Sequence, residues 1–338
     1  MADPSEKLGE FARIARYFRP LAEGFAGAFA LGDDAAAFDV PAGQEVVATA
    51  DAMAEGVHFL RSDDPASIAR RLLRSNLSDL AAMGAEPHAY LLVTALPPEI
   101  GEDWLEAFAR ALGEDQNRYG IHLAGGDSTR SKNGITLSLT ALGFAPKNQL
   151  LRRKTRQEVP AAKPYSIYVS GTIGDAALGL MISQGKKFPG LSAEEENFLK
   201  QRHYAPEPRL ALGLALRSTA QACIDISDGL LADVGHIAEQ SNAEAILHAE
   251  DVPLSAPAQK LCRADPELLP QLLAGGEDYE LAFVVDESAE PHISTVAGRV
   301  NVSLIKIGQL RRGLAGAIHV LDKEGAVMPV KSRGWTHF

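Results

Sequence analysis

The chain has little cysteine and no long apolar run. Only Cys223 and Cys262 occur among 338 residues, so the sequence supports neither a disulfide framework nor a thiolate zinc site. No uninterrupted apolar stretch approaches the roughly 18 residues that span a bilayer, and the opening MADPSEKLGEFARIARYF lacks the apolar region of a signal peptide. We therefore expect a cytoplasmic protein in a reducing compartment, without a membrane partner.

Basic residues are also fewer than acidic residues. The chain has 33 basic and 44 acidic residues, a formal net charge of −11, which argues against binding to a nucleic acid backbone. An acidic enzyme that handles anionic substrates needs cations between itself and them. Length and an apolar content of 46% are those of a globular chain with room for two domains.

The familiar nucleotide-binding and catalytic signatures are missing. There is no H-R-D or D-F-G pair, no H-E-x-x-H and no G-x-S-x-G elbow. The stretch GLMISQGKK (179–187) resembles a Walker A loop, but it has five residues between its glycines and Lys187 where Ser or Thr belongs, so we predict the end of a helix there. If the chain handles ATP, it does so by another architecture.

Periodicity predicts alternating helices and strands, and hence a mixed α/β (α+β) fold. Residues 147–164 have no apolar period and are predicted to be a linker or exposed loop. Helices are expected at Gly9–Tyr17, Pro65–Met83 (with Asp64 as its cap), Glu102–Arg118, Asp175–Ser183 and Leu230–Gln240, and strands at Val46–Thr49, Ile135–Phe144, Ser166–Val169, Ala222–Ile226 and Tyr279–Val285.

Aspartates recur beside glycines and at strand ends. In CIDISDGL, Asp225 and Ser227 share one face of a strand that runs directly into a helix, which places Ser227 or Asp228 at a helix N-terminus. Asp79 lies on the inward stripe of the Pro65–Met83 helix, where a carboxylate needs a partner. In LAGGDST, glycines before Asp127 would let backbone approach a phosphate.

Together these acids form an all-oxygen ligand set, which suits Mg²⁺ and phosphoryl transfer better than zinc chemistry. For any one acid, a structural role as a helix cap or a hydrogen-bonded turn stays open. The set consists of Asp34, Asp51, Asp79, Asp127, Asp225 and Asp228.

The motifs also resemble a known series, in order and over nearly the whole chain. It is that of the thiamine-monophosphate kinase family, in the aminoimidazole-ribonucleotide synthetase superfamily. The motifs are GDDAA (32–36), TAD (49–51), EGVHF (55–59), NLSDLAAMGA (76–85), GGDSTR (125–130), SGTIGDAALGL (170–180), IDISDGL (224–230), GGEDYEL (275–281) and GWTHF (334–338).

The resemblance implies a reaction and a fold. The reaction is phosphorylation of thiamine monophosphate by ATP, assisted by several Mg²⁺ ions. The fold is a two-domain one, with an N-terminal ATP- and magnesium-binding domain (1–148) that pairs into a dimeric β-barrel, and a C-terminal α/β domain (149–338). The resemblance thus implies a homodimer, whose partners are ATP and thiamine monophosphate and not nucleic acid.

The resemblance also assigns roles by position. Magnesium places are Asp34, Thr49, Ala50 (through its backbone), Asp51, Asp79, Asp127, Asp225 and Asp228; nucleotide contacts are Gly126, Asp127, Arg153 and Ser227; substrate contacts are His58, Glu277 and Trp335. The family usually has threonine where this chain has Ala50, and the stretch around Arg153 is longer than the family's turn, which leaves Arg152 and Arg153 as alternatives.

Two other functions stay open. One is a sister enzyme of the superfamily that phosphorylates a different small acceptor, although the N-terminal cysteine of selenide users is absent. The other is a non-catalytic nucleotide-binding relative. A full set of aspartates favours an active enzyme, in which no residue needs to act as a general base because a phosphate monoester is mostly a dianion at pH 7.

Overall fold

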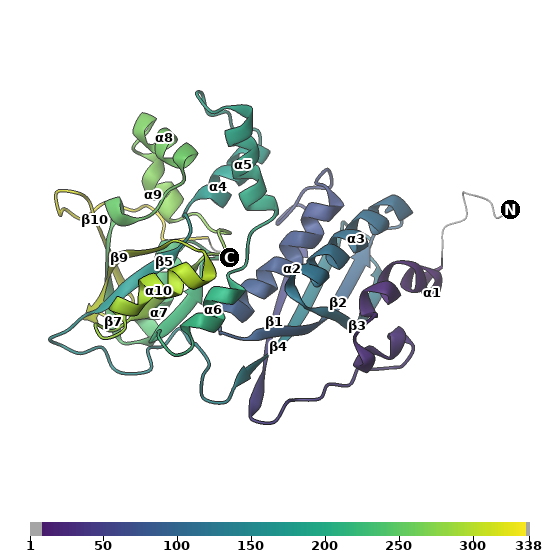
Figure 1. Cartoon of the computed structure of the whole chain (residues 1–338). Helices are drawn as coiled ribbons and strands as arrows, with labels where there is room; N and C mark the ends of the chain where they lie inside the picture. The colour runs from purple at the N-terminus through teal and green to yellow at the C-terminus, as the bar shows by residue number, and fades with distance from the viewer. Residues whose placement is uncertain (1–8, 336–338) are drawn as a thin grey trace. The chain divides into compact units, whose positions relative to one another are not determined.

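The computed structural model describes residues 9–335, which divide into two compact units (Figure 1). Of the described residues, unit 1 comprises 9–80 and 86–147, and unit 2 comprises 81–85 and 148–335. Residues 336–338 of the closing GWTHF motif lie outside the described range. No helix within that range is both long and apolar enough to cross a membrane.

Unit 1 is built on a four-stranded sheet in the order β1-β4-β2-β3. Its strands are β1 (Gln44–Ala54), β2 (Glu86–Leu96), β3 (His122–Arg130) and β4 (Thr136–Pro146). β4 pairs antiparallel with both β1 and β2, while β2 and β3 are parallel. A parallel pair requires a crossover, and helix α3 (Glu102–Tyr119) provides it.

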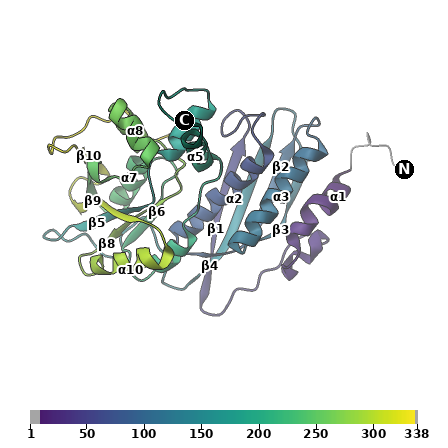
Figure 2. The same cartoon turned by 45° about the horizontal axis from the view of Figure 1, so that its top comes forward.

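Helices cover one face of this sheet. Figures 1 and 2 both place α2 (Pro65–Ala82) and α3 on the same side of the four strands. The predicted start of α2 is confirmed, because the Asp64 carboxylate accepts the Ala66 N–H at 3.3 Å and Pro65 occupies the first helical position. A buried ion pair joins the two helices, with Arg74 Nε 2.7 Å from Asp115 Oδ2.

The other face of the sheet is partly open. Along β1 the residues at odd positions from Val47 to Met53 are buried or half-buried, whereas the even positions from Val46 to Ala52 are exposed. This alternation is the period of two that a strand imposes. Among the described strands β1 and β3 are the two edges of the sheet and do not pair with each other, so the sheet of a single chain is open and not a closed barrel.

The N-terminal segment packs on β3. It forms a short turn of α-helix, α1 (Glu10–Arg13), then the π-helical turn η1 (Ile14–Phe18) and the 3₁₀ turns η2 (Arg19–Ala22) and η3 (Ala26–Leu31). The helix predicted at Gly9–Tyr17 is thus split. Phe29, Ala30 and Leu31 all have positive φ near 50°, which costs about 1–2 kcal/mol per residue for side chains other than glycine.

Unit 2 has a six-stranded sheet in the order β10-β7-β9-β5-β8-β6, in which only β10 and β7 are parallel. Its strands are β5 (Tyr165–Ser170), β6 (Ala222–Asp225), β7 (Ala243–His248), β8 (Leu281–Val285), β9 (Leu304–Arg312) and β10 (Ala317–Leu321). Its helices are α4 (Asp175–Ser183), α5 (Ala193–Tyr204), α6 (Leu210–Leu216), α7 (Leu230–Gln240), η4 (Ala249–Asp251), α8 (Ala256–Ala264), α9 (Leu268–Leu273) and α10 (Glu290–Val300).

Both faces of this sheet are covered, so the interior strand β8 is apolar throughout. In β8, Ala282 and Val284 belong to the core beneath α7, whereas Leu281, Phe283 and Val285 belong to the core beneath α6 and α10. The ends predicted for α4 and α7 are confirmed, and α4 ends at Ser183, within the stretch that resembles a Walker A loop.

Candidate active site

Three of the predicted residues line the contact between β1 and α2. Thr49 Oγ1 donates a hydrogen bond of 2.5 Å to Asp79 Oδ2, and two residues further along the same strand face Asp51 is hydrogen-bonded with Ser75. Burial raises the pKa of Asp51, while the Ser75 hydrogen bond and the nearby His58 oppose this shift. The inward stripe on α2 therefore brings two carboxylates to one strand–helix contact.

His58 is held beside Asp51 by its own hydrogen bonds. Its Nδ1 accepts the Ala54 N–H at 3.0 Å, and its carbonyl oxygen accepts a bond of 2.7 Å from Arg71. Because Nδ1 is an acceptor, the neutral ring carries its proton on Nε2. The ring is thus held in one tautomer and one orientation.

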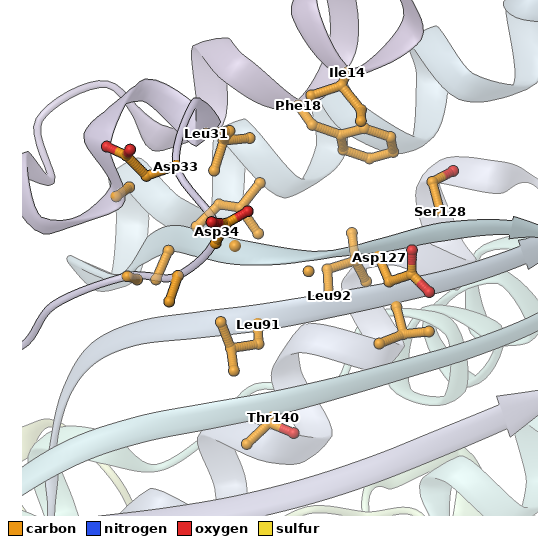
Figure 3. A pocket seen from close by; sticks show the side chains of 18 of the residues that line it. Ile14, Phe18, Leu31, Asp33, Asp34, Leu91, Leu92, Asp127, Ser128 and Thr140 are labelled. Atoms are coloured by element: carbon orange, nitrogen blue, oxygen red, sulfur yellow. The ribbon is translucent and has the colours of Figure 1, made fainter. Parts of the chain in front are cut away.

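Asp34 and Asp127 lie on the opposite face of the sheet. They line a cavity of about 540 Å³ between the N-terminal segment and strands β2 and β3. Figure 3 shows Asp34 on the N-terminal segment and Asp127 on β3 at the wall of this cavity. Much of the remaining wall is apolar and includes Ile14, Phe18 and Leu31.

The glycine before Asp127 has a structural reason beyond access for a phosphate. Gly126 has φ +156°, and a Cβ at this position would lie 1.8 Å from the carbonyl oxygen of Leu92. Only glycine allows β3 to pair with β2 here. The exposed Asp127 carboxylate follows directly at the cavity.

In unit 2 the IDISDGL turn is organised by an acid that the sequence analysis did not single out. The Asp233 carboxylate accepts the backbone N–H groups of Ser227, Asp228 and Gly229 at 3.0, 3.1 and 3.1 Å. Burial, and then the charge of Asp228, raise the pKa of Asp233 to about 7. The signal was an acid in the first turn of α7, where the helix dipole favours it.

This arrangement corrects one expectation. The helix begins at Leu230 with Gly229 as its N-cap, not at Ser227 or Asp228. The backbone N–H groups of Ser227 and Asp228 already bind Asp233, which leaves the side chains of these two residues for contacts with a ligand. Asp225, at the end of β6, is buried.

The GGEDYEL motif docks on the same turn. The Glu277 N–H donates to the Ser227 carbonyl oxygen at 2.8 Å, and the Trp335 N–H donates to the Asp228 carbonyl oxygen at 3.0 Å. A Cβ on Gly276 would lie 2.2 Å from the Ser227 oxygen, which explains the glycine. The structure thus brings Ser227, Asp228, Glu277 and Trp335 together.

Neighbouring acids of this motif point inward. Asp278 accepts the N–H groups of Gly174 and Ala176 at 2.6 and 3.0 Å, and Glu280 is bound by Arg202, Arg209 and the Ser170 hydroxyl. Asp175, also buried, accepts a hydrogen bond from Thr172 and lies 3.8 Å from Arg202. Burial raises the pKa of Asp278 to about 7, whereas Arg209 and Arg202 lower that of Glu280 despite its burial.

The loop that carries Arg153 is tied to β6. Cys223 N–H donates to the Arg152 carbonyl oxygen, and Arg156 N–H donates to the Gln221 carbonyl oxygen, both at 2.9 Å. Leu151, Thr155 and Val159 are buried at intervals of four residues, a pattern that the linker prediction missed. Arg152 and Arg153 are both exposed, so the two alternatives stay open.

The predicted acids do not form one metal cage. Within residues 9–335 no three His, Cys, Asp or Glu side chains converge as a metal-binding group. Mg²⁺ usually takes only one or two protein carboxylates and completes its shell with water and substrate phosphates. The half-buried Asp51, which is hydrogen-bonded with Ser75, fits a site of this kind.

Comparisons with known proteins identify the family of the chain. Residues 32–145 match the family model for AIR synthase related protein, N-terminal domain. The thiamine-monophosphate kinase of Escherichia coli (strain K12) is 38% identical over 333 residues, which cover 98% of each chain. The chain belongs to the thiamine-monophosphate kinase family.

Solved structures extend this likeness to the fold. The thiamine-monophosphate kinase from Stenotrophomonas maltophilia K279a is 38% identical with a TM-score of 0.77 and covers 88% of this chain and 91% of its own. AaThiL complexed with AMPPCP and TMP is 28% identical with a TM-score of 0.75, over 99% of this chain and 100% of its own.

Members of the thiamine-monophosphate kinase family are thiamine-phosphate kinases and join two anionic groups. The acids of this chain fall into two classes, which differ in burial and in whether they are bound to other groups of the protein. Asp34, Asp127 and Asp228 are exposed or half-buried, whereas Asp278, Glu280 and Asp233 are buried and bound to donors of the protein itself. The buried acids fix the backbone of the turns that carry the other acids.

The pKa of Asp278 predicts a stability that depends on pH. Its folded pKa of about 7 lies above its ordinary value of 3.8, so the folded state binds the extra proton and this contribution to stability is lost as pH rises from about 4 to 7. Relative to Asp278→Asn, the wild type should lose about 2–3 kcal/mol of unfolding free energy between pH 5 and pH 8.

Urea denaturation at the two pH values measures this difference, and the exposed Asp251→Asn serves as the matched control. A difference between wild type and Asp278→Asn that does not change with pH would contradict the assignment.

Proposed function

We propose that the chain transfers the γ-phosphoryl group of ATP directly to the phosphate of thiamine monophosphate, giving ADP and thiamine diphosphate. The observation that carries the proposal is the likeness over 99% of the chain to AaThiL, a structure that holds both AMPPCP and TMP. The 38% identity to the Escherichia coli kinase over its length supports the same substrates.

For the nucleotide we propose Gly126, Asp127, Arg153 and Ser227, and for thiamine monophosphate His58, Glu277 and Trp335. Magnesium would be held by Asp34, Thr49, the Ala50 carbonyl, Asp51, Asp79, Asp127, Asp225 and Asp228. Bound Mg²⁺ would supply positive charge between the two phosphates.

The chain's own groups position these ligands. Thr49 fixes one oxygen of Asp79 by its hydrogen bond, and Asp233 fixes the turn that presents Asp228. The indole of Trp335, 61% exposed, offers a face to the thiazolium cation, an interaction worth about 0.5–2 kcal/mol. Preorganised groups of this kind need no rearrangement when the phosphoryl group moves.

No general base is required. The phosphate of thiamine monophosphate has a second pKa near 6 and is therefore mostly a dianion at pH 7, already able to attack. The barrier is the repulsion between two anions, and the catalytic task is alignment and neutralisation. An alcohol acceptor lacks that dianion.

The experiment is ADP release with Mg-ATP and either thiamine monophosphate or thiamine. We expect turnover with the monophosphate and a kcat/KM for thiamine lower by at least about 10²-fold, the usual contribution of a general base that is missing here. Equal turnover of the two acceptors would contradict direct attack by the phosphate.

The same assay separates the proposed reaction from both alternatives. A sister enzyme for another acceptor would bind ATP and release no ADP with thiamine monophosphate, and a non-catalytic relative would bind ATP without turnover under any of these conditions. Either result would remove the proposed reaction.

We also propose a homodimer in which the open sheets of unit 1 pair into a β-barrel. β1 is an edge strand of its sheet, and its even positions expose Val46, Ala48, Ala50 and Ala52. An apolar edge of this kind attracts another strand unless it is covered, and a two-fold axis covers both copies at once.

Light scattering at micromolar concentration should give twice the chain mass of 36.0 kDa. Ala48→Lys should shift the mass toward 36.0 kDa, because it sets like charges against each other across the two-fold axis. Val57→Lys, at an exposed apolar residue outside the strand, should leave the dimer intact. A wild-type protein with the mass of one chain would refute the dimer.

A further inference from the structure

The backbone of Glu277 is held in a conformation that residues with a side chain rarely adopt. Its φ of +68° is unusual for a residue with a side chain, and such strain persists only where neighbouring contacts hold it. Here the Glu277 N–H is bound to Ser227, while the next residue, Asp278, is anchored to the start of α4. The direction of the Glu277 carboxylate then depends on its side-chain torsions and on what the carboxylate meets.

One buried side chain reaches that carboxylate. His203, on α5 and only 3% exposed, places Nδ1 2.9 Å from Glu277 Oε2. The distance is that of a hydrogen bond, yet Nδ1 has no hydrogen-bond partner of acceptable geometry within the described residues. A buried polar atom left in this state costs about 1–3 kcal/mol, and native proteins rarely tolerate it without a function.

The His203 ring is held in place from several sides. It packs against Tyr204 with ring centroids 5.0 Å apart, and a Cβ at Gly179 of α4 would lie 3.0 Å from the His203 Cβ. The preceding residue, Arg202, is bound to Glu280 at 2.9 Å. His203 is therefore held firmly, whereas the Glu277 side chain is more exposed and is the partner that can rotate to align the bond.

We propose that His203 is a positioning residue that orients the Glu277 carboxylate for the cationic acceptor. This inference rests on the proposed function, in which Glu277 contacts thiamine monophosphate. The imidazole is the neutral tautomer with its proton on Nδ1, which donates to Oε2 while leaving the carboxylate its full negative charge. A carboxylate held in one direction loses less conformational entropy when it meets the thiazolium or aminopyrimidine group.

The test compares His203→Leu, which removes the donor, with His203→Asn, whose amide nitrogen lies close to the position of Nδ1. We expect His203→Leu to raise KM for thiamine monophosphate about tenfold, the size of a lost hydrogen bond to a charged group, with KM for ATP and kcat within about twofold of wild type. His203→Asn should restore KM for thiamine monophosphate to within about threefold.

A coupling experiment adds a second readout. The affinity for thiamine monophosphate without ATP can be measured by calorimetry. His203→Leu should lower this affinity in the wild-type background. In a Glu277→Gln background it should cause no further loss, because the two residues act through one contact. Independent effects of the two substitutions would overturn the proposal.

Three other results would also overturn it: an unchanged KM for thiamine monophosphate in a folded His203→Leu protein, equal defects in Leu and Asn variants, or equal rises of KM for both substrates. Failure of the proposed function looks different, since the wild type itself would then release no ADP with thiamine monophosphate.

Discussion

A carboxylate that leaves water must find an N–H, an O–H or a cation, and this requirement organises both units of the chain. In unit 1 the Thr49 hydroxyl binds Asp79 across the contact between β1 and α2. In unit 2 Asp233 gathers three consecutive N–H groups, and Glu280 gathers two arginines. The turns that carry the remaining acids take their shape from these bonds.

Each motif combines acids that are hydrogen-bonded or ion-paired within the protein with acids that are left to bind ligands. GGEDYEL contains one acid, Glu277, whose backbone N–H binds the turn at Ser227, and two acids that are buried as anchors, so neighbouring residues of the same type serve different purposes. IDISDGL likewise presents Asp228 because Asp233, five residues later, binds the backbone that carries it. A kinase that must bring two phosphates together gains from this order, because the protein's own charges are fixed before any substrate arrives.

The sequence predicted the elements whose pattern is local. The 3.6-residue stripe of α2 and the strand-to-helix change at β6 and α7 depend on neighbouring residues, and both agree with the structure. β2 and β3 were not predicted, because GGD signals a turn when read locally, while strand pairing overrides that preference at Gly126. The contacts of His203 and Asp278 join segments some 70 to 100 residues apart, and no single-sequence period reports such pairs.

The central claim is that acids such as Asp79 serve metal-assisted phosphoryl transfer and not stability alone, and one substitution tests it most directly. Asp79→Asn keeps the size of the side chain and its ability to accept from Thr49, but removes the charge that a metal ion needs. We expect turnover with Mg-ATP and thiamine monophosphate to fall at least about 10²-fold and its dependence on magnesium concentration to change, whereas the exposed Asp103→Asn of the same unit should match wild type. A folded Asp79→Asn protein with wild-type turnover and an unchanged magnesium dependence would contradict it.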